Sequence, residues 1–157
     1  MSRRRQATRR VVIEDAKYHS VLVGRLINTV MNSGKKATAQ KIVYGTFESL
    51  IEKNPQSNPL EILQRAVDNA KPRLEVKPRR VGGATYQVPV EAHPDRQTAL
   101  ALRWLVDYAD ARKGSPMMQS LATEIMDAFQ GQGSAIRKRD EVHKMAQANK
   151  AFAHFRW

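Results

Sequence analysis

Hydrophobic spacing changes character in one part of this chain, and that change constrains the fold more than any other feature. Before residue 71 and after residue 94, apolar residues recur every three or four positions, as in amphipathic helices. Between them, two runs of alternating apolar and polar residues flank Gly82-Gly83, which is typical of a β-hairpin. Pro78 and Pro89 cannot donate to a strand ladder, so this hairpin cannot lie inside a larger sheet. The sequence therefore predicts a mainly α fold with a protruding two-stranded arm over residues 72–91.

Six helices are predicted from the spacing and from signals at their ends. They are expected over residues 20–32, 36–53, 59–70, 94–112 and 116–131 and from residue 134 onward. Asn58 followed by Pro59 and Glu61 predicts a capped start for the third helix. We expect Gly34 to cap the end of the first helix, and Ser115 and Ser134 to cap the starts of the last two.

The apolar side chains of these helices predict the core. The second helix is expected to bury one face, made of Ile42, Val43, Phe47, Leu50 and Ile51. In the first strand, Leu74 and Val76 alternate with Glu75 and Lys77, so we expect the two pairs on opposite faces.

Composition narrows the class of protein. A chain of 157 residues with 41% apolar residues can build one core, so we expect a single domain over residues 1–157. It contains no cysteine, which excludes disulfides and thiolate metal sites and suits a reducing compartment such as the cytoplasm. No apolar run is long enough to span a membrane, and the basic start lacks the apolar stretch of a signal peptide.

The positive charge is concentrated in three stretches. Residues 1–10 carry five arginines and no acid, residues 71–80 carry five bases against one acid, and residues 135–157 carry six against two. These stretches account for the formal net charge of +12, and the rest of the chain is close to neutral. Because each phosphate that a cation neutralises releases condensed counterions, such clusters predict a protein that binds nucleic acid.

Each basic stretch also has a simpler interpretation. Residues 1–18 form a basic extension that could only keep the chain soluble, although arginine favours a two-pronged grip on phosphate. The bases of the hairpin could merely protect an exposed strand edge from aggregation. Tyr86 could stack on a base or pack across the strands. The C-terminal helix and tail, residues 134–157, end in aromatic residues that could stack on bases, anchor on a protein or dock back onto the core.

Catalytic and nucleotide-binding motifs are absent. Gly34-Lys35-Lys36 is not a phosphate loop, because Thr29 stands where that motif needs its first glycine and no hydroxyl residue follows Lys35. The two lysines still sit where the N–H groups of a helix start face outward, which predicts a phosphate site. The four histidines have no metal-ligand spacing, and no nucleophile elbow occurs. We therefore expect no enzyme activity, cofactor, metal or small-molecule substrate.

Four separated motifs resemble the bacterial form of the small-subunit ribosomal protein seven family. They cover nearly the whole chain, and residues 11–18 are the least typical part. The motifs are Ser20 to Thr46 through Leu22, Leu26-Ile27, Gly34-Lys35-Lys36 and Ile42-Val43; the hairpin from Lys77 to Pro89; Ala101-Leu102-Arg103-Trp104-Leu105; and His143-Lys144-Met145-Ala146 to Phe155-Arg156-Trp157.

The resemblance implies a six-helix domain with the β-hairpin between its third and fourth helices. It also implies a primary protein of the small ribosomal subunit, which binds the 3′ major domain of 16S rRNA and nucleates assembly of the subunit head. Such a protein lies at the subunit interface, near the exit-site tRNA and the messenger path, and contacts small-subunit proteins nine and eleven. Its location is a cytoplasmic ribosome or an organellar ribosome of bacterial type.

By position, the resemblance assigns two groups of contact residues. The expected rRNA contacts are Arg3, Arg4, Arg5, Arg9, Arg10, Lys35, Lys36, Arg73, Lys77, Arg79, Arg80, Arg96 and Lys113. The residues expected to face tRNA or protein are Gly82, Gly83, Tyr86, Arg137, Lys138, Arg139, Lys150, Phe155, Arg156 and Trp157.

We interpret the chain as a structural RNA-binding protein in which flexible basic arms order on binding around a rigid helical core. The alternative is a DNA-architectural protein that uses the hairpin as a minor-groove arm. The hairpin tip, Gly82-Gly83, carries no apolar wedge, which disfavours this alternative. A nucleic-acid-modifying enzyme is a third, weaker alternative, because the sequence shows no activating pair of residues.

Overall fold

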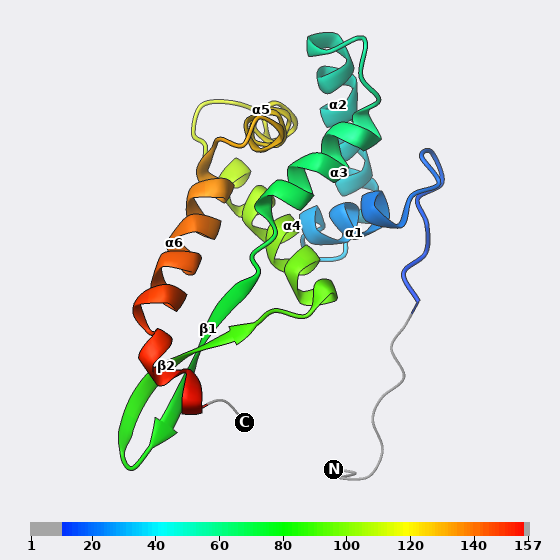
Figure 1. Ribbon diagram of the computed structural model, residues 1–157. Coiled ribbons are helices and arrows are strands. Elements are labelled where there is room, and N and C mark those ends of the chain that lie inside the picture. The colour runs from blue at the N-terminus through cyan, green and yellow to red at the C-terminus, as the bar shows by residue number, and fades with distance from the viewer. Residues whose placement is uncertain (1–10, 156–157) are drawn as a thin grey trace.

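The computed structural model describes residues 11–155. The candidate contacts Arg3, Arg4, Arg5, Arg9, Arg10, Arg156 and Trp157 lie outside the described residues. The described part contains α1 (Val21–Val30), α2 (Lys36–Lys53), α3 (Pro59–Ala70), β1 (Leu74–Val81), β2 (Ala84–Glu91), α4 (Pro94–Asp110), α5 (Met117–Phe129), α6 (Ser134–Ala148) and a 3-10 helix, η1 (Lys150–Phe155). The predicted fold class, helical with a hairpin between the third and fourth helices, is confirmed (Figure 1).

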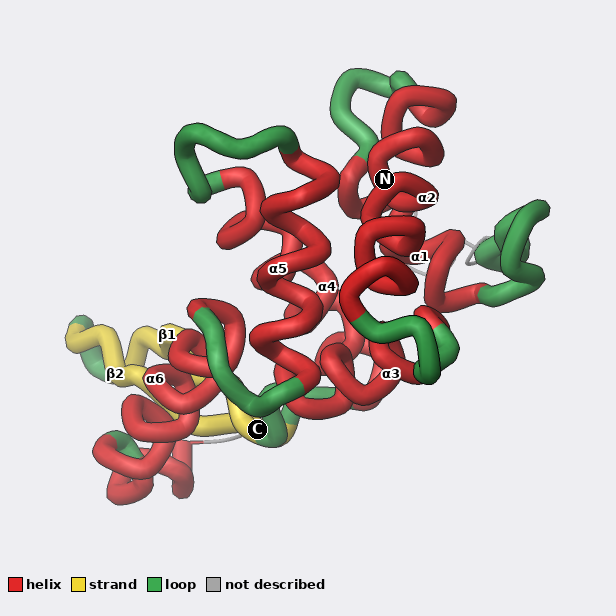
Figure 2. Tube along the Cα trace, turned by 90° about the horizontal axis from the view of Figure 1, so that it is seen from above, coloured by secondary structure: helices red, strands yellow, loops and turns green. Residues whose placement is uncertain are grey.

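The helices pack around α5. This helix contacts α2, α3, α4 and α6, and Figure 2 shows it beside α4 in the middle of the helical body. Its buried face carries Leu121 and Ile125, which join Phe47 of α2 and Leu63 of α3 in one core. None of the helices in residues 11–155 is long and apolar enough to cross a membrane.

The start of α3 is built as the sequence predicts. Pro59 is the first helical residue, and the Oδ1 of Asn58 accepts a hydrogen bond from the Leu60 N–H at 3.0 Å. The next helix uses a similar device, since His93 precedes Pro94 and its ring nitrogen accepts from the Asp95 N–H. These caps satisfy backbone donors that have no partner within the helix.

Several predicted boundaries and one predicted core residue are wrong. The first helix ends at Val30 because Met31 adopts an extended conformation, so Gly34 does not cap it. Instead Gly34, with a φ of +76°, forms the turn that leads into α2. In α2, Ile51 is 42% exposed because it lies outside the contact with α3 and α5. Helices α4 and α5 each end two residues earlier than predicted.

The two predicted serine caps are also wrong. Pro116, not Ser115, precedes α5, and the Ser115 hydroxyl pairs with the hydroxyl of Ser120 at 2.9 Å. Ser134 is already helical and makes no capping bond. In its place the Glu124 carboxylate, from α5, accepts a hydrogen bond from the Ala135 N–H at 2.9 Å. A buried acceptor brought in by tertiary packing has displaced the local one.

The hairpin has the predicted glycine turn. β1 and β2 are antiparallel, with Val81 opposite Ala84, and both Gly82 and Gly83 have positive φ. Such a turn requires glycine-like conformations at both central positions. In Figure 1 the hairpin extends away from the helical body, and the end of α6 and η1 run beside it. The contacts of α6 with both strands, and of η1 with β2, show that the arm has support along its length.

Candidate nucleic-acid interface

The chain enters the helical body through an extended segment, residues 11–14, that lies against α1. A Cβ placed on Gly24 would be 2.7 Å from the Ile13 carbonyl oxygen, so only glycine allows this close approach. The turn that follows is held by buried Asp15, whose carboxylate accepts from the N–H groups of Lys17 and Tyr18. This anchoring fixes the position of residues 11–14 beside α1.

The same carboxylate ties the segment to α2. The Tyr44 hydroxyl donates to the Asp15 Oδ1 at 2.8 Å. Burial, together with the hydrogen bond to Asp15, raises the pKa of Tyr44 above its ordinary value of 10.0. Since the hydroxyl stays protonated and donates, it is a stable link between residue 15 and the second helix.

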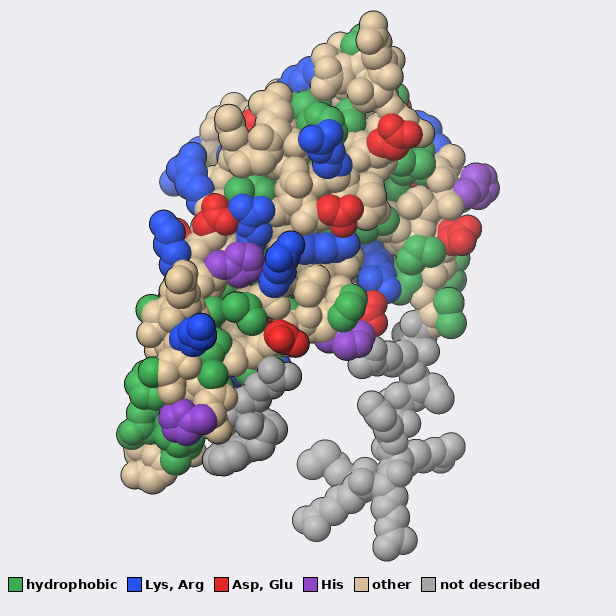
Figure 3. Space-filling view, viewed as in Figure 1, with side chains coloured by type: hydrophobic (Ala, Val, Ile, Leu, Met, Phe, Trp, Pro, Cys, Tyr) green, Lys and Arg blue, Asp and Glu red, His purple; other side chains and the backbone are tan. Residues whose placement is uncertain are grey.

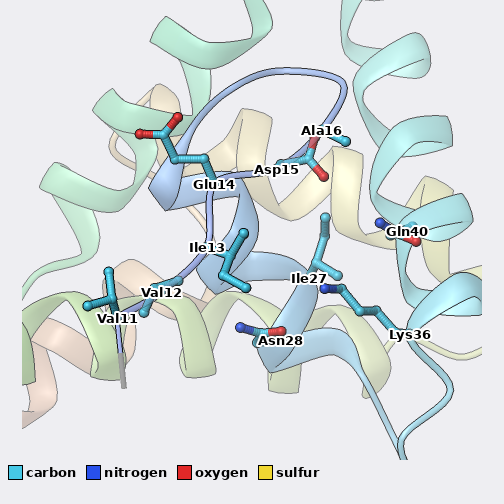
Figure 4. Close-up of a pocket in the computed structure, with 11 residues that line it drawn as sticks. Val11, Val12, Ile13, Glu14, Asp15, Ala16, Ile27, Asn28, Lys36 and Gln40 are labelled. Atoms are coloured by element: carbon cyan, nitrogen blue, oxygen red, sulfur yellow. The ribbon is translucent and has the colours of Figure 1, made fainter. Parts of the chain in front are cut away.

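A groove of about 420 Å³ runs beside this segment. Figure 4 shows residues 11–16 on one side of it, with Lys36 and Gln40 reaching in from α2 and Asn28 from α1. Lys35, the residue before α2, makes no side-chain capping bond, and Lys35 and Lys36 are both exposed there. The predicted lysine pair therefore lies at a helix N-terminus, with Lys36 facing residues 11–16 across the groove, and a helix N-terminus suits phosphate.

The face formed by α1 and α4 contains two arginines that the sequence analysis did not single out as contacts. Arg25 and Arg103 line a second groove of about 670 Å³, together with Asn28 and Asp107. Arg25 is partly held by Asp95, with 3.5 Å between its Nη2 and the carboxylate. The sequence does contain a sign of this polar face. Arg25, Asn28 and Thr29 are the only polar side chains of α1, and their spacing places them on one side of the helix.

At the base of the hairpin, two predicted contacts share one carboxylate. Glu75 lies 3.0 Å from the Lys77 Nζ and 3.3 Å from the Arg96 Nε. Burial raises the pKa of Glu75, but the hydrogen bonds from Lys77 and Arg96 outweigh it and hold the pKa below its ordinary value. Glu75 is more buried than Leu74 or Val76, so the alternation of β1 did not predict which of these side chains is most enclosed. The triad keeps both cations in place and about half exposed.

Toward the hairpin tip, exposed bases point to both faces. Arg79 is opposite Tyr86 and Arg80 is opposite Thr85. Since residues directly opposite one another share a face and successive residues alternate, Arg79 lies with Lys77 on one face and Arg80 on the other. The ribbon therefore presents cations on two sides near its tip, and Arg79 shares its face with Tyr86.

The loop between α4 and α5 combines an exposed cation with a fixed one. Lys113 is exposed, as expected of a contact residue. Its neighbour Arg112 pairs with Asp127 and with Glu124, whose side chain is 0% exposed. The hydrogen bonds from Arg112 to these two carboxylates raise its pKa. This buried cluster was not predicted, because a single glutamate in a helix gives no sign that it is enclosed.

The C-terminal helix α6 carries a second set of bases. Arg137 is exposed, and Lys138 pairs with Glu141 at 3.4 Å. Arg139 is tied to the body, because it donates to the Asn69 carbonyl of α3 as well as to Asp140. Figure 3 shows lysines and arginines spread over this face, along α6 and across toward α3, with carboxylates between them.

The helix also holds the base of the hairpin. The Arg73 N–H donates to the His143 Nε2 at 3.0 Å, so Arg73 lies beside α6. Burial, with the positive charges of Arg139 and Arg73, lowers the pKa of His143 below 6.5, although Asp140 opposes the shift. The imidazole is therefore neutral at physiological pH and can accept the hydrogen bond.

At the end of the chain, Lys150 is exposed and the aromatic side chains of η1 turn toward the hairpin. The rings of Phe152 and Phe155 each lie 5.1 Å from the ring of Tyr86. Tyr86 is thus a packing residue, and the aromatic tail docks on β2 instead of on the helical core. The exposed Gly82 and Gly83 lie beyond this contact, at the tip.

The exposed bases on the hairpin, at the start of α2 and on α6 suit a polyanion. Across residues 11–155, no group of three or more metal-ligating side chains comes together. The two grooves hold Lys36, Arg25 and Arg103, but their linings also contain the carboxylates of Glu14, Asp15, Asp95 and Asp107. The exposed bases outside the grooves, and not the groove linings, therefore carry the excess of positive charge that suits phosphate contacts.

Comparison with known proteins gives one consistent family. A family model described as ribosomal protein S7p/S5e matches residues 2–150, and the match ends at the first residue of η1. The chain is 55% identical over 157 residues to the small ribosomal subunit protein uS7 of Akkermansia muciniphila, with all of both chains covered. It is 58% identical over 157 residues to that of Dictyoglomus turgidum, again with complete coverage, and 57% identical over 155 residues to that of Thermotoga petrophila, with 99% of each chain covered.

Proposed function

Because the chain belongs to the ribosomal protein S7p/S5e family, we propose that it is a structural constituent of the small ribosomal subunit whose basic surfaces bind the 3′ major domain of 16S rRNA. In this role it nucleates assembly of the subunit head. The observation that carries the proposal is the hairpin register, which sets Lys77 and Arg79 on one face and Arg80 on the other.

Three further features support the same assignment. Lys35 and Lys36 stand at an uncapped helix start, the α1–α4 groove adds Arg25 and Arg103, and the N-terminal segment is anchored beside them. These surfaces would clamp folded RNA from several sides, with the helical core as the fixed frame. Lys113, Arg96 and Arg73 would extend the contact around the body.

We assign the hairpin tip and the α6 face to the neighbours of the subunit interface. The exposed Gly82-Gly83 turn and α6 would face the exit-site tRNA, the messenger path and protein eleven, and protein nine would contact the protein elsewhere. The exposed bases Arg137 and Lys150 fit either an RNA or an acidic protein surface.

The test is binding of the purified full-length protein to a fragment of the 3′ major domain of 16S rRNA. Duplex DNA of equal length is the competitor, at physiological salt. Much tighter binding to the rRNA fragment is expected, and equal affinities would refute the ribosomal assignment in favour of a general or architectural nucleic-acid binder.

The register also predicts the effect of single substitutions. Arg79→Ala and Arg80→Ala should each reduce the slope of log affinity against log salt by about 0.7–0.9, the value for one phosphate contact, and the double variant should lose about twice as much. Arg65→Ala, at an exposed arginine of α3 that packs over the Phe129 ring, is the matched control and should leave the slope unchanged. If only one hairpin arginine affects the slope, only one face of the ribbon contacts RNA, and the assignment of phosphate contacts to both arginines is wrong.

A further inference from the structure

The hairpin is too small to be ordered by its own contacts. Two strands of eight residues form the whole sheet, and a two-stranded ribbon alone is marginally stable in water. Nevertheless Val88, in the middle of β2, is 1% exposed. Something other than the partner strand must therefore cover this ribbon.

The covering element is the end of the chain. α6 contacts β1 and β2, and η1 contacts β2. On one face, Leu74 and Pro89 share a groove with Ala146 of α6 and Ala153 of η1. On the other face, Tyr86 meets the rings of Phe152 and Phe155 at 5.1 Å each. The register places these two sets on opposite faces, so the C-terminal segment contacts the ribbon from both sides.

The two phenylalanines have no role in the helical core. Neither belongs to the core cluster or to the side chains packed against it. Their rings are nearly parallel, with an interplanar angle of 13° and 6.5 Å between centroids, and both lie against the single tyrosine of β2. The two rings therefore stabilise the outer half of the hairpin, where Arg79 lies opposite Tyr86.

We propose that Phe152 and Phe155 are positioning residues that order the hairpin before RNA arrives. This inference rests on the proposed function, since it concerns how the same hairpin binds RNA. A segment that orders on binding loses affinity to conformational entropy, whereas a segment already held in place does not. The two rings contribute affinity through Tyr86 without touching RNA themselves, and the hairpin is a supported arm instead of a flexible one.

The first measurement uses the free protein. Hydrogen exchange of the β2 amides is compared between the wild type and the double variant Phe152→Ala/Phe155→Ala. Loss of two ring contacts should raise exchange at these amides by about tenfold. Amides of α3 and α5 should exchange as in the wild type, which checks that the helical body remains folded. Phe152→Tyr/Phe155→Tyr keeps both rings and should restore protection.

The second measurement is affinity for the rRNA fragment as a function of salt. The double alanine variant should bind about tenfold more weakly with an unchanged salt slope, because no phosphate contact is lost. Lys150→Ala, at an exposed lysine of the same segment, is the comparison for a direct contact and should lower the slope instead.

The outcomes separate the alternatives. Unchanged exchange in the alanine variant would overturn the proposal. If the affinity falls while the exchange rates stay the same, the rings stack directly on RNA. Faster exchange with unchanged affinity would overturn the link between hairpin order and RNA binding. If the wild type fails to bind the rRNA fragment, the proposed function fails, while the exchange result still decides whether the tail orders the hairpin.

Discussion

Glu124 joins three elements through one buried carboxylate, so its replacement should be among the most destabilising single changes in this protein. It accepts from the Ala135 N–H at the start of α6 and pairs with Arg112 from the loop between α4 and α5, while itself belonging to α5. The side chain is 0% exposed. Glu124→Ala removes the cap of one helix and the principal partner of a partly enclosed arginine at the same time.

The magnitude follows from these two losses. Breaking a buried ion pair costs about 3–5 kcal/mol, but Arg112 is one-third exposed and keeps Asp127, so we take about 2 kcal/mol. Loss of an N-cap acceptor adds about 1 kcal/mol. Glu124→Ala should therefore lower the free energy of unfolding by about 3 kcal/mol. Glu124→Gln keeps an oxygen that can cap α6 and should cost less.

The assay is equilibrium unfolding in urea, followed by far-ultraviolet circular dichroism. Ser134→Ala is the matched control, because Ser134 is the cap that the sequence predicts and the structure rejects. It should change stability by less than about 0.5 kcal/mol. If Ser134→Ala costs as much as Glu124→Gln, the serine caps α6 and the reasoning from Glu124 is refuted. Arg112→Ala combined with Glu124→Ala should cost less than the sum of the two single changes.

Two further predictions concern the ends of the interface. Gly24→Ala should destabilise the protein by about 1–3 kcal/mol in urea unfolding, because its Cβ would meet the Ile13 carbonyl oxygen at 2.7 Å. The control is Gly45→Ala, whose Cβ would meet first the sulfur of the flexible Met118 side chain, at 3.1 Å. Equal losses of stability in the two variants would contradict the close-approach argument. Lowering the pH from about 7 to about 5 should lower the free energy of unfolding through His143. The pKa of His143 is lower in the folded than in the unfolded protein, so the stability that the neutral ring contributes is lost as the pH falls through the folded-state pKa. His143→Ala should flatten that part of the stability profile, and an unaltered profile would show that the bond to Arg73 does not titrate.

Local signals predicted the fold well where the partners are close in sequence. Asn58 and Pro59 start α3 as predicted, and the glycine pair makes the hairpin turn, because the groups that satisfy the backbone lie within three residues. Ser115 and Ser134 failed because a distant group competes for the same donor or hydroxyl. No pattern in the sequence shows that Glu124 is buried, or that it caps the N–H of Ala135, eleven residues later.

The candidate interface likewise contains residues that the sequence could predict and residues that it could not. Charge concentration selected the hairpin bases and the α6 bases, which the structure places on exposed surfaces, but the bases of one stretch do not all face solvent freely. Lys77 is held by Glu75, and Arg139 by Asp140 and the Asn69 carbonyl. Conversely, Arg25 and Arg103 come from neutral segments and meet only because α1 packs on α4. Net charge along a sequence cannot show which isolated arginines share a groove.

The support of the hairpin by the chain's own end changes how the charges act. Glu75 holds two cations, Lys77 and Arg96, where the hairpin leaves the helical body. The two glycines set the turn, and the outer half of the hairpin packs against the rings of Phe152 and Phe155. On the proposed function, a ribbon whose backbone is ordered in this way would lose less conformational entropy when RNA binds. The register keeps Arg79 and Arg80 on opposite faces, so the two side chains would reach different parts of the RNA surface.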